Sequence, residues 1–185
     1  VQSLNDEILS NIKRDNISSE KLIQLGPALK NEGLSTACDI ILGLPGETYD
    51  TAIQTIKDVL NANIDWINIW TLMLLDGSEL NTPKEREKWD LKSKFRIIPR
   101  DFVKFKSGKV VMEIEEVGIG TNSLSFNDYV ELRLFSLIIK IISATPCYGS
   151  IFKFMKFYDV EIFDLVFSML KNTNLSSKKL QIFFE

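Results

Sequence analysis

Two apolar segments, residues 35–42 and 64–75, are separated by a stretch whose apolar residues recur at helical intervals. Strands that are apolar along their whole length are buried on both faces, which is typical of parallel sheets covered by helices. Parallel neighbours also need a crossover connection, and a helix between the two segments supplies it. The pattern therefore predicts an α/β fold in which these two strands lie side by side in a parallel sheet.

Two more helices are expected before the first of these strands. Apolar residues recur at a helical interval over residues 4–12, and Arg14 would complement the dipole in that helix's last turn. A second helix is predicted over residues 18–32, where Pro27 indicates a kink or a late start. Residues 1–3 are interpreted as the end of a strand, so strand and helix alternate from the beginning of the sequence.

Three ranges of the sequence differ in pattern. Residues 1–80 alternate strand and helix signals, whereas residues 81–124 contain a polar linker or surface helix followed by a predicted β-hairpin with its turn at residues 107–108. Residues 125–185 are helical in character and open on a capping sequence, Ser125 to Asp128. We expect a partial α/β unit, a linker with a hairpin, and a helical C-terminal region.

Composition excludes several classes of site. The chain has no histidine, which removes Ser-His-Asp catalysis, Cys-His catalysis and every histidine metal site. Its net charge of −3 and pI near 5.2 give no basic footprint for nucleic acid. The two cysteines, Cys38 and Cys147, have no partner at metal-ligand spacing, and we expect them to be reduced in the cytoplasm. The most apolar run, residues 134–142, is shorter than the roughly 20 residues that a membrane span needs.

The segment Gly43–Thr48 follows the first predicted strand and is the most informative one for a binding site. In open parallel sheets and α/β barrels, ligands bind at the carboxyl ends of the strands. Two glycines around Pro45 allow a sharp turn with little side-chain bulk, against which a flat ring could lie. The helix that follows offers N–H groups to a ligand oxygen. An ordinary strand-to-helix turn explains the same residues, so both interpretations stay open.

Other polar and aromatic residues lie near the same strand ends. Asp39 falls inside an apolar strand, where a carboxylate must be paired or hydrogen-bonded, with ribose hydroxyls or Arg14 as suitable partners. A structural ion pair or an outward-facing side chain is an equal alternative for Asp39. Gln2 can donate and accept at once, which suits a sugar or a carboxylate. Trp66, Trp70 and Trp89 could stack on a ligand, but packing in the core is the expectation for them.

Four segments resemble, in this order and spacing, strands four to six of the partial (β/α)6 barrel of radical S-adenosylmethionine (SAM) enzymes. They are Val1–Glu7, Lys13–Arg14, Asp39–Thr48 and Leu72–Leu80. Residues 81–185 resemble, more loosely, the region after the barrel in cobalamin-binding radical SAM proteins. The resemblance implies an α/β fold that is the C-terminal part of this barrel, followed by a β-hairpin and a helical tail, within a longer protein.

The resemblance also implies a chemistry and its partners. Radical SAM enzymes cleave SAM reductively at a 4Fe–4S cluster to give a 5′-deoxyadenosyl radical, and cobalamin is an additional candidate cofactor. A small-molecule substrate, an external electron donor and the upstream part of the same protein would be the partners. The cluster-binding CxxxCxxC motif is absent from this sequence. We therefore expect the chain to be inactive alone, and we assign it no catalytic residue and no metal ligand.

SAM contacts follow from the same resemblance. In coproporphyrinogen oxidases of this superfamily, a glutamine, an arginine and an aspartate share the spacing of Gln2, Arg14 and Asp39. Arg14 would meet the methionine carboxylate, and Asp39 and Gln2 would meet the ribose or the amino-acid part. The adenine would be met by the turn and by the end of the sixth strand, at Gly43, Gly46 and Met73.

Two alternatives from other classes remain. The chain could be a non-catalytic interaction domain, in which residues 1–80 are a scaffold and the helical tail docks a partner. It could also be a different α/β enzyme whose Gly43–Thr48 turn binds a phosphate.

Overall fold

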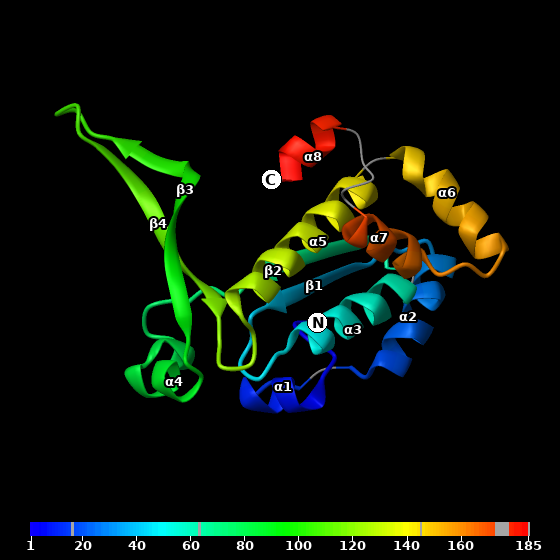
Figure 1. Cartoon of the computed structure of the whole chain (residues 1–185), viewed down its shortest axis with the longest axis horizontal. Helices are drawn as coiled ribbons and strands as arrows, with labels where there is room; N and C mark the ends of the chain where they lie inside the picture. The colour runs from blue at the N-terminus through cyan, green and yellow to red at the C-terminus, as the bar shows by residue number, and fades with distance from the viewer. Residues whose placement is uncertain (16, 63, 145, 173–177, 185) are drawn as a thin grey trace.

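The chain folds into helices packed on one face of a small parallel sheet, with a second, antiparallel sheet projecting to one side (Figure 1). This computed structural model describes residues 1–15, 17–62, 64–144, 146–172 and 178–184. The strands are β1 (Ala37–Leu42), β2 (Trp66–Thr71), β3 (Lys92–Lys104) and β4 (Val110–Gly120). The helices are α1 (Asp6–Asn11), α2 (Ser19–Asn31), α3 (Tyr49–Asn61), α4 (Pro83–Lys88), α5 (Phe126–Ala144), α6 (Pro146–Phe157), α7 (Ile162–Lys171) and α8 (Lys178–Phe184), with a short 3-10 helix, η1 (Glu79–Asn81).

β1 and β2 form the predicted strand–helix–strand unit. They pair in parallel, with Asp39 opposite Asn68, and α3 is the crossover between them. β2 ends at Thr71, earlier than predicted, because the chain beyond it turns to β4. There the Leu74 N–H donates to the Glu116 carbonyl over 2.9 Å, and the Gly118 N–H donates to the Leu72 carbonyl over 2.8 Å. The foot of the hairpin therefore continues the edge of the parallel sheet.

The N-terminal helices differ in detail from the prediction. The first helix, α1, begins after Asn5, whose side chain accepts from the Ile8 N–H, and it ends at Asn11. Arg14 therefore lies beyond the helix, because Lys13 before it adopts a left-handed conformation with φ of 53°. α2 begins at Ser19 and contains Pro27, so of the two alternatives predicted there the late start is wrong, and the kink stays a prediction.

Residues 1–3 are not a regular strand, yet they lie beside β1. The Ile41 N–H donates to the Gln2 carbonyl over 3.0 Å, on the neighbouring backbone segment. The N-terminal segment thus occupies the position of a strand next to β1, which is close to what the sequence indicated.

The predicted hairpin and helix cap are both present. β3 and β4 are antiparallel and are joined by a turn in which Gly108 has a φ of 83°. At the start of α5, the Asp128 N–H donates to the Ser125 hydroxyl and the Ser125 N–H donates to the Asp128 carboxylate, which is the reciprocal cap. α4 is the surface helix expected between residues 81 and 94.

One face of the parallel sheet carries the core. The side chains of Cys38, Ile40 and Ile67 pack there against α3, α5 and α7 in one apolar cluster. Phe135 of α5 is fully buried, and its ring meets the edge of Phe163 on α7 at 6.1 Å between centroids. The helical region after residue 125 therefore shares its core with the α/β unit, and separate domains at our predicted boundaries stay a prediction.

The opposite face of the sheet is open. Trp66 and Trp70 on this face are each 54% exposed, so the expectation that they pack in the core is wrong for this chain. Across the described residues, the strands form two small sheets and no closed barrel is visible. The fold is accordingly a mixed α/β fold, and Cys147 has its side chain outside the described part.

A membrane-spanning helix was sought among the described residues. No single helix there is long and apolar enough to cross a membrane. The segments Phe126–Ser143 and Tyr148–Met155 satisfy length and composition only when taken together, and they are bent by 98°. The apolar side chains of α5 that enter this count, such as Ile138 and Ile142, are buried in the protein core.

Removing the central ring of the core should destabilise the whole chain. We expect Phe135→Ala to lower the free energy of unfolding by about 3–5 kcal/mol, because it leaves a cavity among packed aromatic rings. Phe157→Ala is the matched control, since Phe157 is 81% exposed. Urea unfolding followed by circular dichroism measures both, and equal midpoints for the two variants would contradict this description of the core.

Candidate functional site

Asp39 lies on the open face of the sheet and is held by two hydrogen bonds. Its Oδ1 accepts from the Asn68 amide over 2.9 Å and from the Trp70 indole N–H over 3.0 Å. The bond from Trp70, and then that from Asn68, keep the pKa of Asp39 below its usual range, so the carboxylate is ionised at neutral pH. Both bonds go to one oxygen, Oδ1, of a residue that is exposed.

The turn after β1 is built around a buried carboxyl group. Glu47 is fully buried, and its Oε2 accepts from the Gly43 N–H over 2.6 Å. Burial raises the pKa of Glu47 to about 8, although the Gly43 and Leu44 backbone amides work against that rise. Glu47 is therefore mostly protonated at neutral pH. Within the described residues its Oε1 has no hydrogen-bond partner.

The shape of the turn depends on its two glycines. Gly43 and Gly46 each have a φ of 84°, a left-handed conformation that favours glycine. A side chain at Gly46 would also meet the amide nitrogen of Asn11 at 2.6 Å. That amide donates to the Pro45 carbonyl over 3.1 Å, so α1 is attached directly to the turn.

The predicted SAM-binding residues are brought together in part. Gln2 lies beside β1 through its bond to Ile41, two residues beyond Asp39. Met73 follows β2, bridges Val117 of β4, and is 45% exposed next to the turn. A side chain built on Gly43 would lie 4.0 Å from the Cβ of Leu72, so the turn and the end of β2 are close neighbours.

Arg14 is the member of this set that the structure leaves apart. It is exposed, and its backbone N–H donates to the Leu9 carbonyl at the end of α1. Among the described residues, no hydrogen bond or ion pair joins the side chains of Gln2, Arg14 and Asp39. Their convergence around one ligand stays a prediction. The ion pair considered between Asp39 and Arg14 is replaced by the bonds from Asn68 and Trp70.

Sequence reasoning missed the partners that organise this site. Asn68 and Trp70 were not assigned to Asp39, although parallel pairing of two equally spaced strands puts Asn68 opposite it. Glu47 was seen only as part of the turn. A single acidic residue directly after Gly-Leu-Pro-Gly and before an N-capping threonine, Thr48, was the available signal.

A metal centre was also sought. In the ranges that the structure describes, no group of three or more cysteine, aspartate, glutamate or histidine side chains is arranged to hold a metal ion. Cys38 is a buried free thiol, and burial raises its pKa, so it is a poor ligand.

The chain is similar to two known proteins, and no family model matches it. It is 28% identical over 151 residues to the cobalamin-dependent radical SAM methyltransferase TokK of Streptomyces tokunonensis, covering 80% of this chain and 21% of that protein. It is 28% identical over 134 residues to the 2-(S-pantetheinyl)-carbapenam-3-carboxylate methyltransferase of Streptantibioticus cattleyicolor, covering 71% and 19%. The match thus spans about a fifth of each relative, and it supports a distant relationship to radical SAM enzymes.

The buried carboxyl of Glu47 should make stability depend on pH. Its pKa is about 8 in the folded chain and near 4.5 when exposed, so the folded state binds the extra proton between these values. The free energy of unfolding contributed by Glu47 should therefore fall as pH rises from about 5 to 8, by up to about 1.4 kcal/mol per pH unit. Glu47→Gln keeps the shape, stays neutral and should remove this slope.

Urea midpoints at several pH values measure this effect. Glu87→Gln on the exposed surface of α4 is the matched control and should keep the wild-type slope. Curves for Glu47→Gln and the unmodified chain that run parallel from pH 5 to 8 would show that Glu47 is ionised inside the fold.

Proposed function

We propose that this chain is the last part of the SAM-binding barrel of a radical SAM enzyme, related to cobalamin-dependent methyltransferases. The observation that carries the proposal is the β1–turn–α3–β2 unit, in which a tight two-glycine turn lies at the carboxyl end of a parallel sheet and an ionised Asp39 lies on the open face of the strand before it. Ligands of α/β sheets bind at this end. The similarity to two radical SAM methyltransferases supports the same assignment.

Asp39 would hold the ribose of SAM. Two hydrogen bonds fix Oδ1 and keep the group ionised, so Oδ2 is a preorganised acceptor for a sugar hydroxyl. Gln2, on the neighbouring segment, would contact the ribose or the amino-acid part. Arg14 would reach the methionine carboxylate from the end of α1, which the Asn11–Pro45 bond holds at the turn.

The turn would receive the adenine. Gly43 and Gly46 present backbone without side chains, and the buried Glu47 holds the Gly43 amide in place from behind. The backbone at Met73, beside this turn, would line the other side of the ring.

The described residues do not fit an iron–sulfur cluster. Three thiolates are needed, and the whole sequence holds two cysteines, far apart. We propose that the upstream part of the parent protein supplies the 4Fe–4S cluster and any cobalamin site. Reductive cleavage of SAM to the 5′-deoxyadenosyl radical, with an external electron donor, is then an activity of the parent, and no step of it is assigned to residues of this chain.

The open sheet face supports a partner within the same protein. Two tryptophans that are half exposed on one sheet face are unusual for a finished surface. Further barrel strands of the parent would cover this face and place Asp39 inside a barrel.

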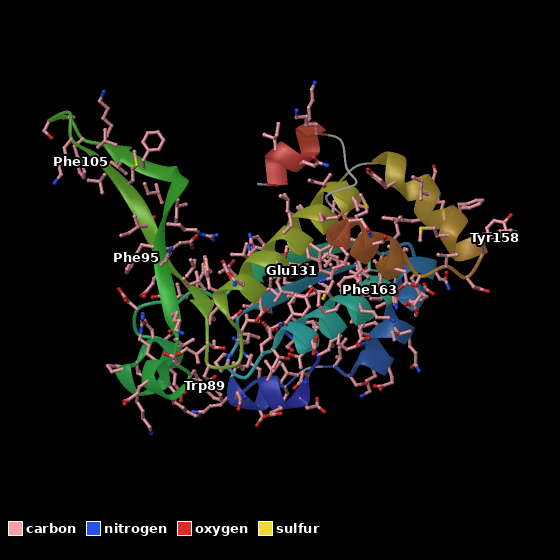
Figure 2. The ribbon with its side chains drawn as sticks, viewed as in Figure 1. Trp89, Phe95, Phe105, Glu131, Tyr158 and Phe163 are labelled. Carbon is pink, nitrogen blue, oxygen red and sulfur yellow. The ribbon has the colours of Figure 1, made fainter. Side chains whose placement is uncertain are left out.

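The hairpin favours a second candidate, a non-catalytic interaction domain. Phe95, Ile97 and Ile114 share one face of the hairpin and are each more than half exposed. Figure 2 shows Phe95 and Phe105 on the projecting arm, away from the core around Phe163. Such a face is typical of a docking surface, and this candidate needs no SAM.

Substitution at Asp39 tests the proposed function in a longer protein that contains the upstream cluster motif. We expect Asp39→Asn and Arg14→Gln to weaken SAM binding by about tenfold or more, because each removes one charged hydrogen bond. Iron content after anaerobic reconstitution should stay at the wild-type value. Asp50→Asn, on the exposed side of α3, is the control. Calorimetry with SAM gives the affinities, and unchanged affinity in both variants would end the proposal.

Tryptophan fluorescence separates the two candidates. If upstream strands cover the sheet, emission from Trp66 and Trp70 should shift to the blue in the longer protein, because both rings leave water. Trp70→Phe in each protein isolates part of the signal. An interaction domain with a free sheet face predicts the same emission maximum in both proteins.

A further inference from the structure

A groove outside the turn lies between β2, α5 and β3. It encloses about 260 Å³, just below the roughly 300–1,000 Å³ of drug-sized ligand pockets. Its lining is residues 67–71 of β2, with Arg96, Arg133, Ser136, Leu137 and Lys140. Figure 1 shows α5 lying along β2, with the hairpin of β3 and β4 projecting beside them. Neither the turn at Gly43–Glu47 nor Asp39 lines this groove.

Two basic side chains in the groove are held by neutral hydrogen-bond acceptors. Arg133 and Lys140 are two turns apart on α5 and therefore share a helix face. Arg133 donates to the Ile69 carbonyl over 3.2 Å, and Lys140 donates to the Asn68 amide oxygen over 3.1 Å. Both acceptors are neutral, so they position the side chains without cancelling the charge. In the described part of the chain, no carboxylate forms an ion pair with either residue.

Of the two carboxylates near the groove, Glu115 is paired with a cation and Asp39 is not. Arg96, the third cation of the groove, is paired with Glu115 on the neighbouring strand. Asp39 accepts from the neutral side chains of Asn68 and Trp70, so its negative charge remains and offsets one of the three cations. The groove therefore has an excess of positive charge within a small volume.

Apolar surface lies beside these cations. The indole of Trp70 is half exposed, and Leu137 is 38% exposed on the same helix face as Arg133 and Lys140. A planar guanidinium binds a carboxylate through two parallel hydrogen bonds, and an indole face stacks on a flat apolar body. A small molecule that combines the two features would contact both β2 and α5 along the groove.

We propose that this groove binds the carboxylate of a small organic acid with an apolar body. Arg133 and Lys140 receive the carboxylate, and Trp70 and Leu137 hold the apolar part. The inference goes beyond the proposed function and does not rest on it. The binding itself needs no SAM and no cluster.

Titration with benzoate tests the site on this chain. We expect saturable shifts of the Trp70 indole N–H in NMR spectra, with a dissociation constant on the order of 1 mM. Arg133→Gln and Lys140→Gln should each weaken binding about tenfold, since each removes one charge-assisted hydrogen bond. Lys84→Gln, on exposed α4, makes the same change of charge away from the groove and should bind as the unmodified chain does.

The outcomes separate the possible errors. Absence of saturable benzoate binding would overturn the proposal, as would equal weakening by Lys84→Gln, which would indicate only the net charge. Inorganic phosphate that displaces benzoate and binds more tightly would make this a phosphate site instead.

Arg133 also supports β2, so the NMR spectrum of each variant must keep the chemical-shift dispersion of a folded protein. Exposed Lys140 gives the independent test. Benzoate binding that persists when a longer parent fails to bind SAM would contradict the proposed function and leave this site intact.

Discussion

The contact between the buried carboxyl of Glu47 and the Gly43 amide organises the end of the sheet. It closes the turn between β1 and α3 from inside, where water cannot replace it. The backbone carbonyl of the same residue accepts from the Ser123 hydroxyl over 2.8 Å, which ties the loop before α5 to the turn. Together the two bonds join the strand, the turn and the loop. Without the Glu47 carboxyl, the buried Gly43 N–H would have no partner, which costs about 1–3 kcal/mol. Protonation keeps the cost of burying the carboxyl low.

The two faces of the parallel sheet have opposite environments. Helices α3, α5 and α7 cover one face and supply the core, whereas Asp39, Trp66 and Trp70 lie on the open face. Burial of one face stabilises this two-stranded unit. The helix α5 adds a contact along the free edge of β2, where Arg133 donates to the Ile69 carbonyl. The open face then holds polar and aromatic groups that a covered sheet would not expose. This asymmetry makes the face available for a ligand and for further strands alike.

The strand–helix–strand unit was predictable because its signals are local. Apolar runs, a Gly-Pro-Gly turn and an N-capping threonine each act within a few residues, and the cap at Ser125 and the turn at Gly108 are of the same kind. The ends of elements were less accessible. β2 stops at Thr71 because residues 72–74 pair with β4, a contact set by a hairpin some 40 residues away. α1 stops before Lys13 because of a backbone conformation that no composition signal marks.

Site residues divide along the same line. The turn glycines were found because their position at a strand end follows from the topology, and Asp39 was found because a carboxylate inside an apolar strand is conspicuous. The burial of Glu47 and the exposure of the tryptophans were missed, since both depend on which layer covers which face.

The groove cations illustrate the point further. Arg133 and Lys140 share a helix face by spacing, which the sequence shows, yet the neutral acceptors that hold them, Ile69 and Asn68, come from a strand that only the folded chain brings to α5. A charged side chain held by neutral partners retains its attraction for an anion, whereas one held by a carboxylate, as Arg96 is, loses most of it. The identity of the hydrogen-bond partner, more than the number of basic residues, therefore determines where this chain can recognise a negative group.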